Sequence, residues 1–475
     1  MFRTIVRKEV LGHILSFRFV VTLALLLVIV PLTTFVLTND TLRRVGDASQ
    51  RRAELETYMR TYAHFNRVSN VLRTAMPPIP FHALVRGLSA EANLSELDDD
   101  PLPVMFPLVD LVFVVSILMS LAALIFAYDA VSGEKEDGTL KLTLANGLSR
   151  PVVILAKVAG GAIGLLVPFL MSLVVGLLVV LVHPGVGWDG ADWGALGLLT
   201  AASAIYIVLF YALGVFISTR HHASSASIMT SLLVWVLLVL VVPNLSPYVA
   251  SFLSPTPSRI RIEREVQRLG DTERDDLGRK LQAEALRPLL VKYPVLAEAL
   301  SESDQKRLVE RDPAAREAFE ARRKAVQAAW DEANRVQSAK IEAVRSEAGR
   351  REAAQTSLAR ALSMVSPLAA FTYVATDLTS TGMRNEAYLG RLGGVWDRAF
   401  WDYARAKLDG LQAKDPATDW WNTAVDMSDR PRFEYREEAL GARVAAALPG
   451  LLLLSGYGLV LFALAYVSFL RYDVR

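Results

Sequence analysis

The residues whose types and spacing could do chemistry are concentrated in one short stretch, YDAVSGEKEDGTLKLTLANGLSRP, from Tyr128 to Pro151. It places carboxylates and amines between glycines, with Asp129 at its start and Arg150 near its end. Such a segment is compatible with three functions: it could bind phosphate, transfer protons, or dock another protein.

The sequence argues against the first two functions. A phosphate-binding loop requires G-x-x-x-x-G-K-[ST] after a strand, and Thr139 stands where the lysine belongs. Three carboxylates in the same turn would repel phosphate. Paired carboxylates can transfer protons, but this stretch contains no histidine and the chain contains no cysteine. No catalytic site is therefore predicted, and the pattern favours docking of a protein.

Long apolar runs flank this stretch, and the chain contains six runs of that kind. Each provides the roughly 17–25 residues that a helix needs to cross a bilayer. They are continuously apolar rather than alternating, which favours helices over barrel strands. The predicted spans are residues 19–37, 108–129, 151–182, 194–219, 224–250 and 444–470. The predicted fold class is an all-α membrane protein with six transmembrane helices and a largely helical extracytoplasmic domain.

Lysine and arginine near the span ends predict the orientation, because cytoplasmic loops carry an excess of both. They precede the first span, lie between the second and third spans, and follow the last span, whereas the loop from His183 to Trp193 has neither. We therefore expect both termini, including the tail at residues 471–475, to be cytoplasmic. Residues 38–107 and 251–443 then lie outside as extracytoplasmic segments. The first span is too long for a cleavable signal peptide, and no small-residue cleavage site follows it.

The stretch at residues 130–150 is then a cytoplasmic connection between two spans. Acidic residues gather where a short helix would begin, which suits the positive end of its dipole. Gly138 allows a sharp bend, and TLKLTLA provides about two helical turns before Asn146 and Gly147 stop them. Ser149 can cap the helix that Pro151 opens. The predicted product is a short helix lying crosswise at the cytoplasmic face.

The N-terminal residues 1–18 have a pattern of their own. Basic residues flank apolar residues that recur every four positions, namely Phe2, Val6, Val10 and Ile14. This spacing predicts an amphipathic helix that lies on the cytoplasmic leaflet and contacts membrane lipid.

The outer segments are expected to be helical because they are rich in alanine, glutamate, arginine and glutamine. One helix of about 50 residues should begin at Asp312 and Pro313, which suit the cap and the first turn, with Gly349 as a possible interruption. Such helices could be solvated spacers or could bind a partner. The apolar segment from Ser363 to Gly382 is too short to span, so it should lie at the membrane face or pack on the spans.

Aromatic residues cluster further downstream. They are Trp396, Phe400, Trp401, Tyr403, Trp420 and Trp421. Aromatics of this kind are usual at a bilayer interface, and they could also stack on a sugar or lipid head group.

The segment YDAVSGEKEDGTLKLTLANGLSRPVVILAKVAGG resembles the signature of ABC-2 type transporter permeases, in which G-E-[KR]-E-x-G-T-L follows the second span. The branch it most resembles is that of the copper-enzyme (nitrous-oxide reductase) maturation permeases. SPLAAFTYVATDLTSTG also resembles a segment that precedes the last span in members with large outer domains.

The resemblance implies a dimeric subunit of the bacterial inner membrane, formed with a second copy or a homologue, that binds two cytoplasmic ATPase subunits. ATP and Mg²⁺ would be bound by those subunits, so this chain itself would be neither an enzyme nor a cofactor carrier. The implied coupling residues are Gly133, Glu134, Lys135, Glu136, Asp137, Gly138, Thr139 and Leu140.

Two functions remain open at this point. The chain could be the permease of an exporter for a lipid-like or polymeric substrate, or it could transmit ATPase movements to outer helices that regulate an extracytoplasmic partner. The net charge of +2 implies no affinity for nucleic acid. The only histidine pair, His221 and His222, lies on a cytoplasmic turn, so no metal site is predicted. The apolar runs inside these spans, such as Leu111–Tyr128 and Val158–Val182, contain no charges, which argues against an ion-coupled carrier.

Overall fold

The computed structural model describes residues 2–65, 79–87, 109–145, 149–183, 185–297, 302–416 and 418–471. Its elements are all helical in these ranges. The chain forms two compact units, one of Met1–Pro243 with Ser363–Arg475 and the other of Asn244–Leu362.

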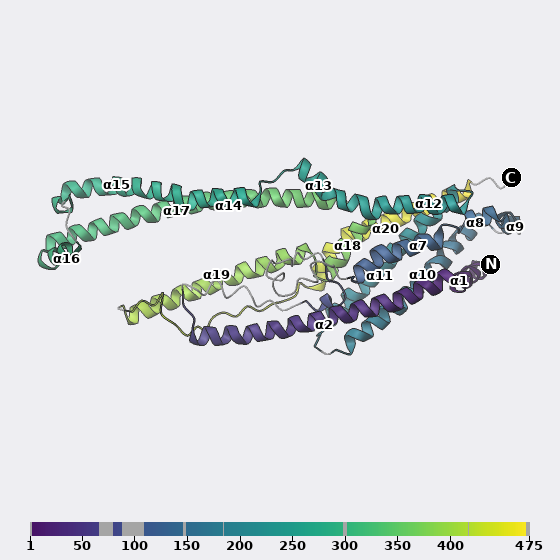
Figure 1. Cartoon of the computed structure of the whole chain (residues 1–475), viewed down its shortest axis with the longest axis horizontal. Helices are drawn as coiled ribbons and strands as arrows, with labels where there is room; N and C mark the ends of the chain where they lie inside the picture. The colour runs from purple at the N-terminus through teal and green to yellow at the C-terminus, as the bar shows by residue number, and fades with distance from the viewer. Residues whose placement is uncertain are drawn as a thin grey trace. The chain divides into compact units, whose positions relative to one another are not determined.

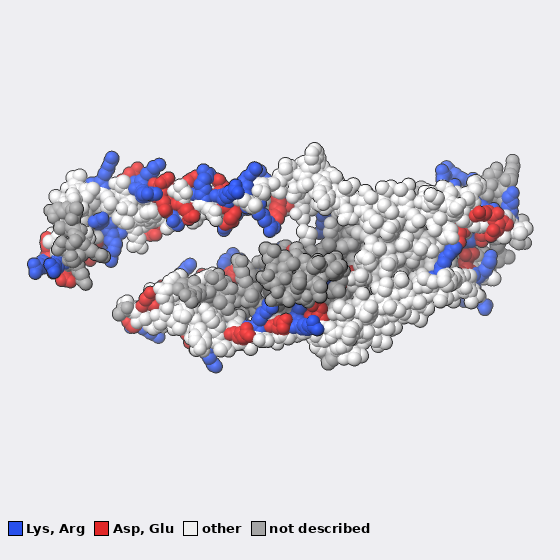
Figure 2. Space-filling model, in the orientation of Figure 1, with Lys and Arg blue, Asp and Glu red and all other residues white. Residues whose placement is uncertain are grey.

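Six stretches of helix in the described residues are long and apolar enough to cross a membrane, which confirms the predicted fold class. Their elements are α2 (Phe17–Thr61), α6–η3–α7 (Leu111–Phe113, Val114–Met119 and Ser120–Ala127), α10 (Arg150–Leu181), α11 (Gly190–Arg220), α12–η4–α13 (Ser224–Trp235, Val236–Val241 and Val242–Leu253) and α20 (Leu440–Leu470). The elements η3 and η4 are π-helical turns inside the second and fifth spans. Figure 2 shows a surface almost free of charged residues over these spans.

The remaining helices are shorter or polar. In the first unit they are α1 (Phe2–Ile14), η2 (Pro80–Ala83), α8 (Ser132–Glu136), α9 (Thr139–Ala145), α18 (Pro367–Leu378) and α19 (Met383–Lys414). In the second unit they are α14 (Arg259–Gln267), η5 (Arg268–Glu273), α15 (Arg274–Lys292), η6 (Pro294–Ala297), α16 (Glu302–Arg311) and α17, which begins at Pro313 and ends at Ser363.

Local chemistry sets several of the helix starts. The Ser16 side chain accepts a hydrogen bond from the backbone N–H of Phe19 at the start of α2, and Asp110 accepts from Phe113 at the start of α6. Asp189 and Asp192 form a reciprocal capping box before α11. Ser149 occupies the N-cap position of α10 as predicted, but its side chain makes no capping hydrogen bond.

Helix α11 lies at the centre of the membrane unit (Figure 1). It packs against α7, α10, α18 and α20, and its Tyr206, Phe210 and Tyr211 side chains are fully buried. The apolar α18 packs on α11 and α20 with most of its residues buried. Its N-cap residue Ser366 donates a 2.5 Å hydrogen bond to the carbonyl of Leu238 in η4. Of the two placements predicted for this segment, the structure shows packing on the spans.

A second hydrophobic core lies beyond the spans of the same unit, where the end of α2 meets α19. Its buried residues are Met59, Ala63, Phe65, Phe400, Ala404, Val425 and Met427. Trp396, Tyr403 and Trp420 pack against it, and Trp421 stacks on Phe65. Of the predicted aromatic cluster, Phe400 therefore lies in a protein core and three members pack against it, whereas Trp401 and Trp421 are exposed.

The second unit contains a long helical hairpin in which α15 and α17 lie side by side (Figure 1). Gly278 of α15 leaves room for the ring of Trp330, whose indole N–H donates to Gln282. Asp312 caps α17 by accepting from the N–H of Ala314 at 2.9 Å. The predicted 50-residue helix is confirmed at 51 residues, whereas the predicted interruption at Gly349 is wrong because α17 continues through it.

Candidate functional site

The segment singled out by the sequence forms two short helices, α8 and α9, joined by a tight turn. Gly138 lies in this turn with φ +70°, a conformation that glycine adopts without strain. The predicted bend and the predicted helix at residues 139–145 are both confirmed. Helix α8 was not predicted. Asn146 and Gly147, the expected stop signals, lie outside the described residues.

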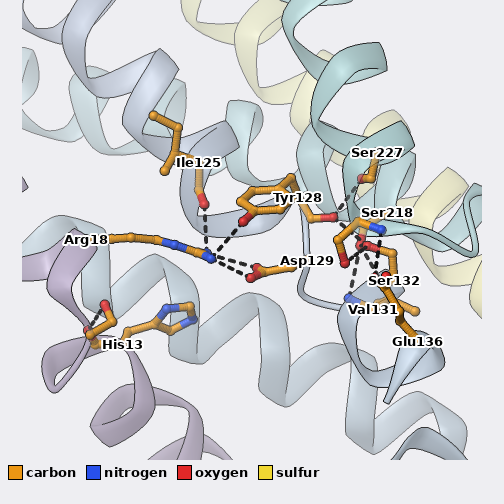
Figure 3. Close-up of polar contacts among 12 residues, drawn as sticks. His13, Arg18, Ile125, Tyr128, Asp129, Val131, Ser132, Glu136, Ser218 and Ser227 are labelled. Carbon is orange, nitrogen blue, oxygen red and sulfur yellow. Dashed lines mark hydrogen bonds and ion pairs between the residues drawn. The ribbon is translucent and has the colours of Figure 1, made fainter. Parts of the chain in front are cut away.

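Serine hydroxyls from neighbouring spans hold the start of this segment (Figure 3). The Ser218 hydroxyl of α11 accepts from the backbone N–H groups of Val131 and Ser132 at 3.0 and 2.9 Å. The Ser227 hydroxyl of α12 donates to the carbonyl of Tyr128 at 2.7 Å. The junction between α7 and α8 is therefore fixed to two other spans by buried or half-buried hydrogen bonds.

Glu134 connects α8 to the third span. Its carboxylate lies 2.8 Å from the ammonium of Lys157 in α10, and only 3% of Lys157 is exposed. The same ammonium lies 3.3 Å from the carboxylate of Glu9 in α1. One buried cation thus binds two carboxylates from different helices. Lys157 directly precedes the apolar run Val158–Val182 in the sequence, and the structure places it inside α10, which begins at Arg150.

Lys135 and Glu136 connect α8 to the fourth and fifth spans. The Lys135 ammonium donates to the carbonyls of Thr219 at 2.6 Å and His221 at 3.2 Å, at the end of α11. The Glu136 carboxylate accepts from the N–H of Ser224 at 3.1 Å, at the start of α12. Carboxylates are favoured at helix N-termini and amines at C-termini, so both contacts suit the dipoles of these helices.

These contacts change the interpretation of the acidic residues. They were predicted to gather at the start of the short helix, where its own dipole would stabilise them. Instead Glu134 and Glu136 lie inside α8 and bind groups on α10 and α12. The three consecutive charged residues Glu134, Lys135 and Glu136 therefore each bind a different span.

The surface of the segment is formed by the turn and by α9. Asp137, Gly138 and Thr139 are exposed, and Leu142 is 68% exposed. Leu140 points the other way and is buried in the main hydrophobic core. Half-buried Gly133 packs near Asp129. The exposed part of the predicted docking element is thus Asp137–Leu142, with Leu140 as its internal support.

Helix α1 packs on a glycine face of α10. A Cβ atom on Gly160 would lie 2.5 Å from Cβ of Glu9, and one on Gly164 would lie 3.0 Å from Cβ of His13. The half-buried residues of α1 are Ile5, Val6, Glu9, Val10, His13 and Ile14. Val6, Val10 and Ile14 of the predicted apolar stripe are therefore half-buried, whereas Phe2 is 44% exposed.

His13 belongs to α1 and lies at its interface with α10. Its ring stacks on Phe126 at 5.5 Å and meets Tyr211 edge-on at 6.4 Å. Burial lowers the pKa of His13 below its ordinary value of 6.5, against the opposing charges of Glu9 and Asp129 and with the help of Lys157 and Arg18. The neutral ring is therefore favoured in the packed state, so this contribution to packing is present above pH 6.5 and is lost as the pH falls.

A second ion pair joins the first two spans at the same level. The Arg18 guanidinium makes two hydrogen bonds to the Asp129 carboxylate, the shorter being 2.7 Å. It also donates to Ile125 O and to the Tyr128 hydroxyl (Figure 3). From the sequence, Arg18 was only one of the basic residues before the first span that indicate the cytoplasmic side. Asp129 was only the last residue of the second span.

Sequence reasoning missed Glu9, Lys157, Ser218 and Ser227. A lysine just ahead of an apolar run is indistinguishable from an ordinary span flank, and a serine inside a span carries no sign of its partner. One signal was present for Lys157: the glycines at positions 160, 161 and 164 indicate that other elements approach α10 closely there. In the part of the chain that the structure describes, no group of histidine and carboxylate side chains could hold a metal ion.

The six candidate spans define a helical protein that crosses a membrane several times. The chain belongs to the ABC-2 transporter family, because the family described as ABC-2 family transporter protein matches residues 3–474. The resemblance found from the sequence is thereby confirmed.

Curated relatives are permeases named NosY. The probable ABC transporter permease protein NosY of Stutzerimonas stutzeri is 34% identical over 125 residues, 26% of this chain and 45% of that protein. The protein of the same name from Pseudomonas aeruginosa is 32% identical over 123 residues, with the same two shares. This chain therefore spans about half the length of the curated relatives it matches.

Proposed function

We propose that this chain is the transmembrane permease subunit of an ABC transporter, and that a separate cytoplasmic ATPase docks on the α8–α9 segment. The observation that carries the proposal is the set of contacts made by Glu134, Lys135 and Glu136. A force applied to the exposed turn would reach α10, α11 and α12 at once through three short polar contacts.

The docking surface itself would be the exposed turn and the first turn of α9. Leu142 presents a large apolar side chain beside the exposed Thr139 and Asp137. Apolar side chains surrounded by polar ones are typical of protein interfaces. The partner would bind ATP and Mg²⁺, and this chain would neither bind nor hydrolyse them.

The proposal includes an arrangement in the membrane. Both termini and the α8–α9 segment would be cytoplasmic in the bacterial inner membrane, and two permease chains would form a dimer. ATP hydrolysis by the partner would drive export of a substrate. The apolar spans favour a lipid-like or polymeric substrate over an ion.

The test is purification of the tagged chain from its native host in mild detergent. We expect an ATPase to co-purify, and we expect the chain stripped of it to hydrolyse no ATP. Leu142→Glu should abolish co-purification at unchanged membrane abundance, because it places a charge in the docking surface. Val291→Glu is the matched control, since Val291 is also highly exposed at 85% but lies in the second unit. Undiminished ATPase recovery with Leu142→Glu would refute this docking surface.

A second function is favoured by the long hairpin of the second unit. Helix α17 alone would be about 75 Å long at 1.5 Å per residue, which is enough to carry a movement away from the membrane. In this alternative the ATPase drives the hairpin to regulate an extracytoplasmic partner protein. Hydrogen exchange in α15 and α17 of the co-purified complex should then change on addition of ATP, whereas an exporter with a passive hairpin would show no change there.

A further inference from the structure

A cavity of about 640 Å³ lies beyond the spans of the first unit, away from the α8–α9 segment. Its walls are α2 around Glu56, α19 around Gly393, and the segment that contains Arg430 and Phe433. Sites for small molecules typically measure about 300–1,000 Å³. The second hydrophobic core contains residues of the same three elements. Packed side chains therefore hold the walls of the cavity in place.

The wall formed by α19 is open because of its glycines. A Cβ atom added at Gly390, Gly393 or Gly394 would meet no atom within 4 Å. These glycines differ from Gly160 and Gly278, where a neighbouring element fills the space that a side chain would need. Among the residues that the structure describes, none fills the space in front of these α19 glycines.

Three arginines line the cavity: Arg52 on α2, and Arg430 and Arg432 on the segment that contains Phe433. The Arg430 guanidinium, whose side chain is only 4% exposed, binds both oxygens of Glu56 at 2.9 and 3.4 Å. Arg432 shares the same carboxylate at 3.8 Å, although 70% of its side chain is exposed. Arg52 lies one turn before Glu56 on α2 and also lines the cavity. Glu56 is thus shared by two guanidinium groups, and Arg52 adds a third to the lining of the cavity.

Aromatic rings and two further carboxylates line the cavity on α19 and on the segment just after Arg432. The indole N–H of Trp396 donates to the Pro431 carbonyl at 3.0 Å, so its polar atom is already satisfied. Phe433 meets the Trp396 ring edge-on at 6.0 Å. Asp397 and Glu434, the neighbours of these two rings in sequence, line the cavity as well. Ring faces beside carboxylates are suited to an ammonium group.

We propose that this cavity binds a zwitterionic amphiphile that carries a phosphate and an ammonium group, as in the head group of a zwitterionic phospholipid. The phosphate would contact Arg52 and Arg432, because guanidinium groups bind phosphate oxygens in pairs. The ammonium would lie against Trp396 and Phe433, and the first carbons of the chains would cover the glycine face of α19. A purely anionic ligand would meet Asp397 and Glu434, and a purely cationic one would meet the arginines.

The experiment measures binding by isothermal titration calorimetry to the full chain in non-ionic detergent. The probes are dihexanoyl phosphatidylcholine, dihexanoyl phosphatidylglycerol with the same chains, and glycerophosphocholine without chains. We expect the choline lipid to bind saturably and the glycerol lipid to bind about tenfold more weakly or worse, because one charge-assisted contact is lost. Equal affinity for the two lipids would overturn the proposal.

The variants separate the cavity from unspecific binding to the detergent-covered surface. Gly393→Leu should abolish binding by filling the cavity, and the fold should tolerate it because a Cβ there meets no atom. Gly349→Leu is the matched control, since Gly349 is also a helical glycine with open space around it, in α17. Thermal unfolding of both variants checks the fold. Unchanged binding by Gly393→Leu would refute the site.

Two further binding measurements test which part of the ligand each wall recognises and whether the ligand is a membrane lipid. Arg432→Glu should weaken binding of the choline lipid by about tenfold or more, since it replaces a cation at the phosphate position. Glycerophosphocholine should bind more weakly than the lipid if the source is a membrane lipid, and equally well if it is a soluble head-group compound. Because the cavity is separate from the α8–α9 segment, failure here would leave the proposed ATPase docking unaffected.

Discussion

At the scale of single residues, Lys157 is a side chain that joins three helices. It is almost fully buried and binds Glu134 of α8 and Glu9 of α1. A buried charge is costly unless it is paired, and removal of one partner leaves the other uncompensated. Lys157 therefore holds the crosswise segment and the N-terminal helix against the same point of α10.

Replacement of Lys157 by alanine should be strongly destabilising for this reason. Loss of one partner of a buried ion pair typically costs about 3–5 kcal/mol, and here two carboxylates with side chains 17% and 21% exposed would remain. We expect a lower unfolding temperature in detergent and faster hydrogen exchange in both α1 and α8. Lys157→Arg should retain part of the stability because it keeps the charge.

Lys141→Ala is the matched control for that experiment. Lys141 lies in α9 close to the same segment, but its side chain is exposed. Its removal should leave the unfolding temperature unchanged. If Lys157→Ala proved as stable as Lys141→Ala, the two ion pairs would contribute nothing to holding these helices together.

At the scale of elements, the turn between α8 and α9 sets the direction of the exposed surface. Gly138 has φ +70° and no neighbouring atom near its Cβ position. The constraint on this residue is therefore the backbone conformation and not the available space. A β-branched residue would be strained here, whereas asparagine visits this region more readily.

Gly138→Val should consequently redirect α9 while α8 stays bound to its spans. The strain is about 1–2 kcal/mol, which is too small to prevent six apolar spans from inserting. We expect normal membrane abundance with reduced co-purification of the ATPase, measured on the same samples. Gly138→Asn should retain co-purification. Equal recovery of the ATPase with valine and with asparagine would show that the turn geometry is irrelevant to docking.

At the scale of the whole molecule, charge is distributed in zones. Figure 2 shows lysine and arginine interspersed with acidic residues along the helices of the second unit, and a further charged zone at α8. The first unit separates an uncharged belt from a polar part that contains the second core and the cavity. This zoning is what a bilayer requires of a protein that crosses it and has domains outside it.

Cysteine labelling in intact cells should reveal which zone faces the cytoplasm. The chain has no cysteine of its own, so a single introduced thiol reports one position. Ser338→Cys in α17 should react with a membrane-impermeant maleimide, and Thr139→Cys should react only after the membrane is permeabilised. Both positions are exposed in the structure, so burial cannot explain a difference. The reverse pattern would invert the predicted topology and remove the proposed ATPase docking.

The sequence by itself determined the elements that depend on runs of residues. The six apolar runs follow from the transfer of apolar side chains into the membrane. The bend follows from the conformational freedom of Gly138, and the 51-residue helix from Pro313 follows from helix propensity and capping. Each depends only on neighbours within a few turns. The GEKEDGTL segment also lies within a few residues of sequence, and it was recognisable as a signature of the ABC-2 family that the chain belongs to.

The tertiary structure alone decided which side chains meet. Glu9 and Lys157 are 148 residues apart in sequence, with the first two spans between them, and their ion pair exists because the glycines of α10 let α1 approach. The aromatic cluster became a core because the end of α2 covers Phe400. Such contacts depend on shape and distance between elements far apart in the chain. Local sequence patterns do not encode contacts of this kind. The charges inside α10 and the cavity beside Trp396 could therefore not be predicted.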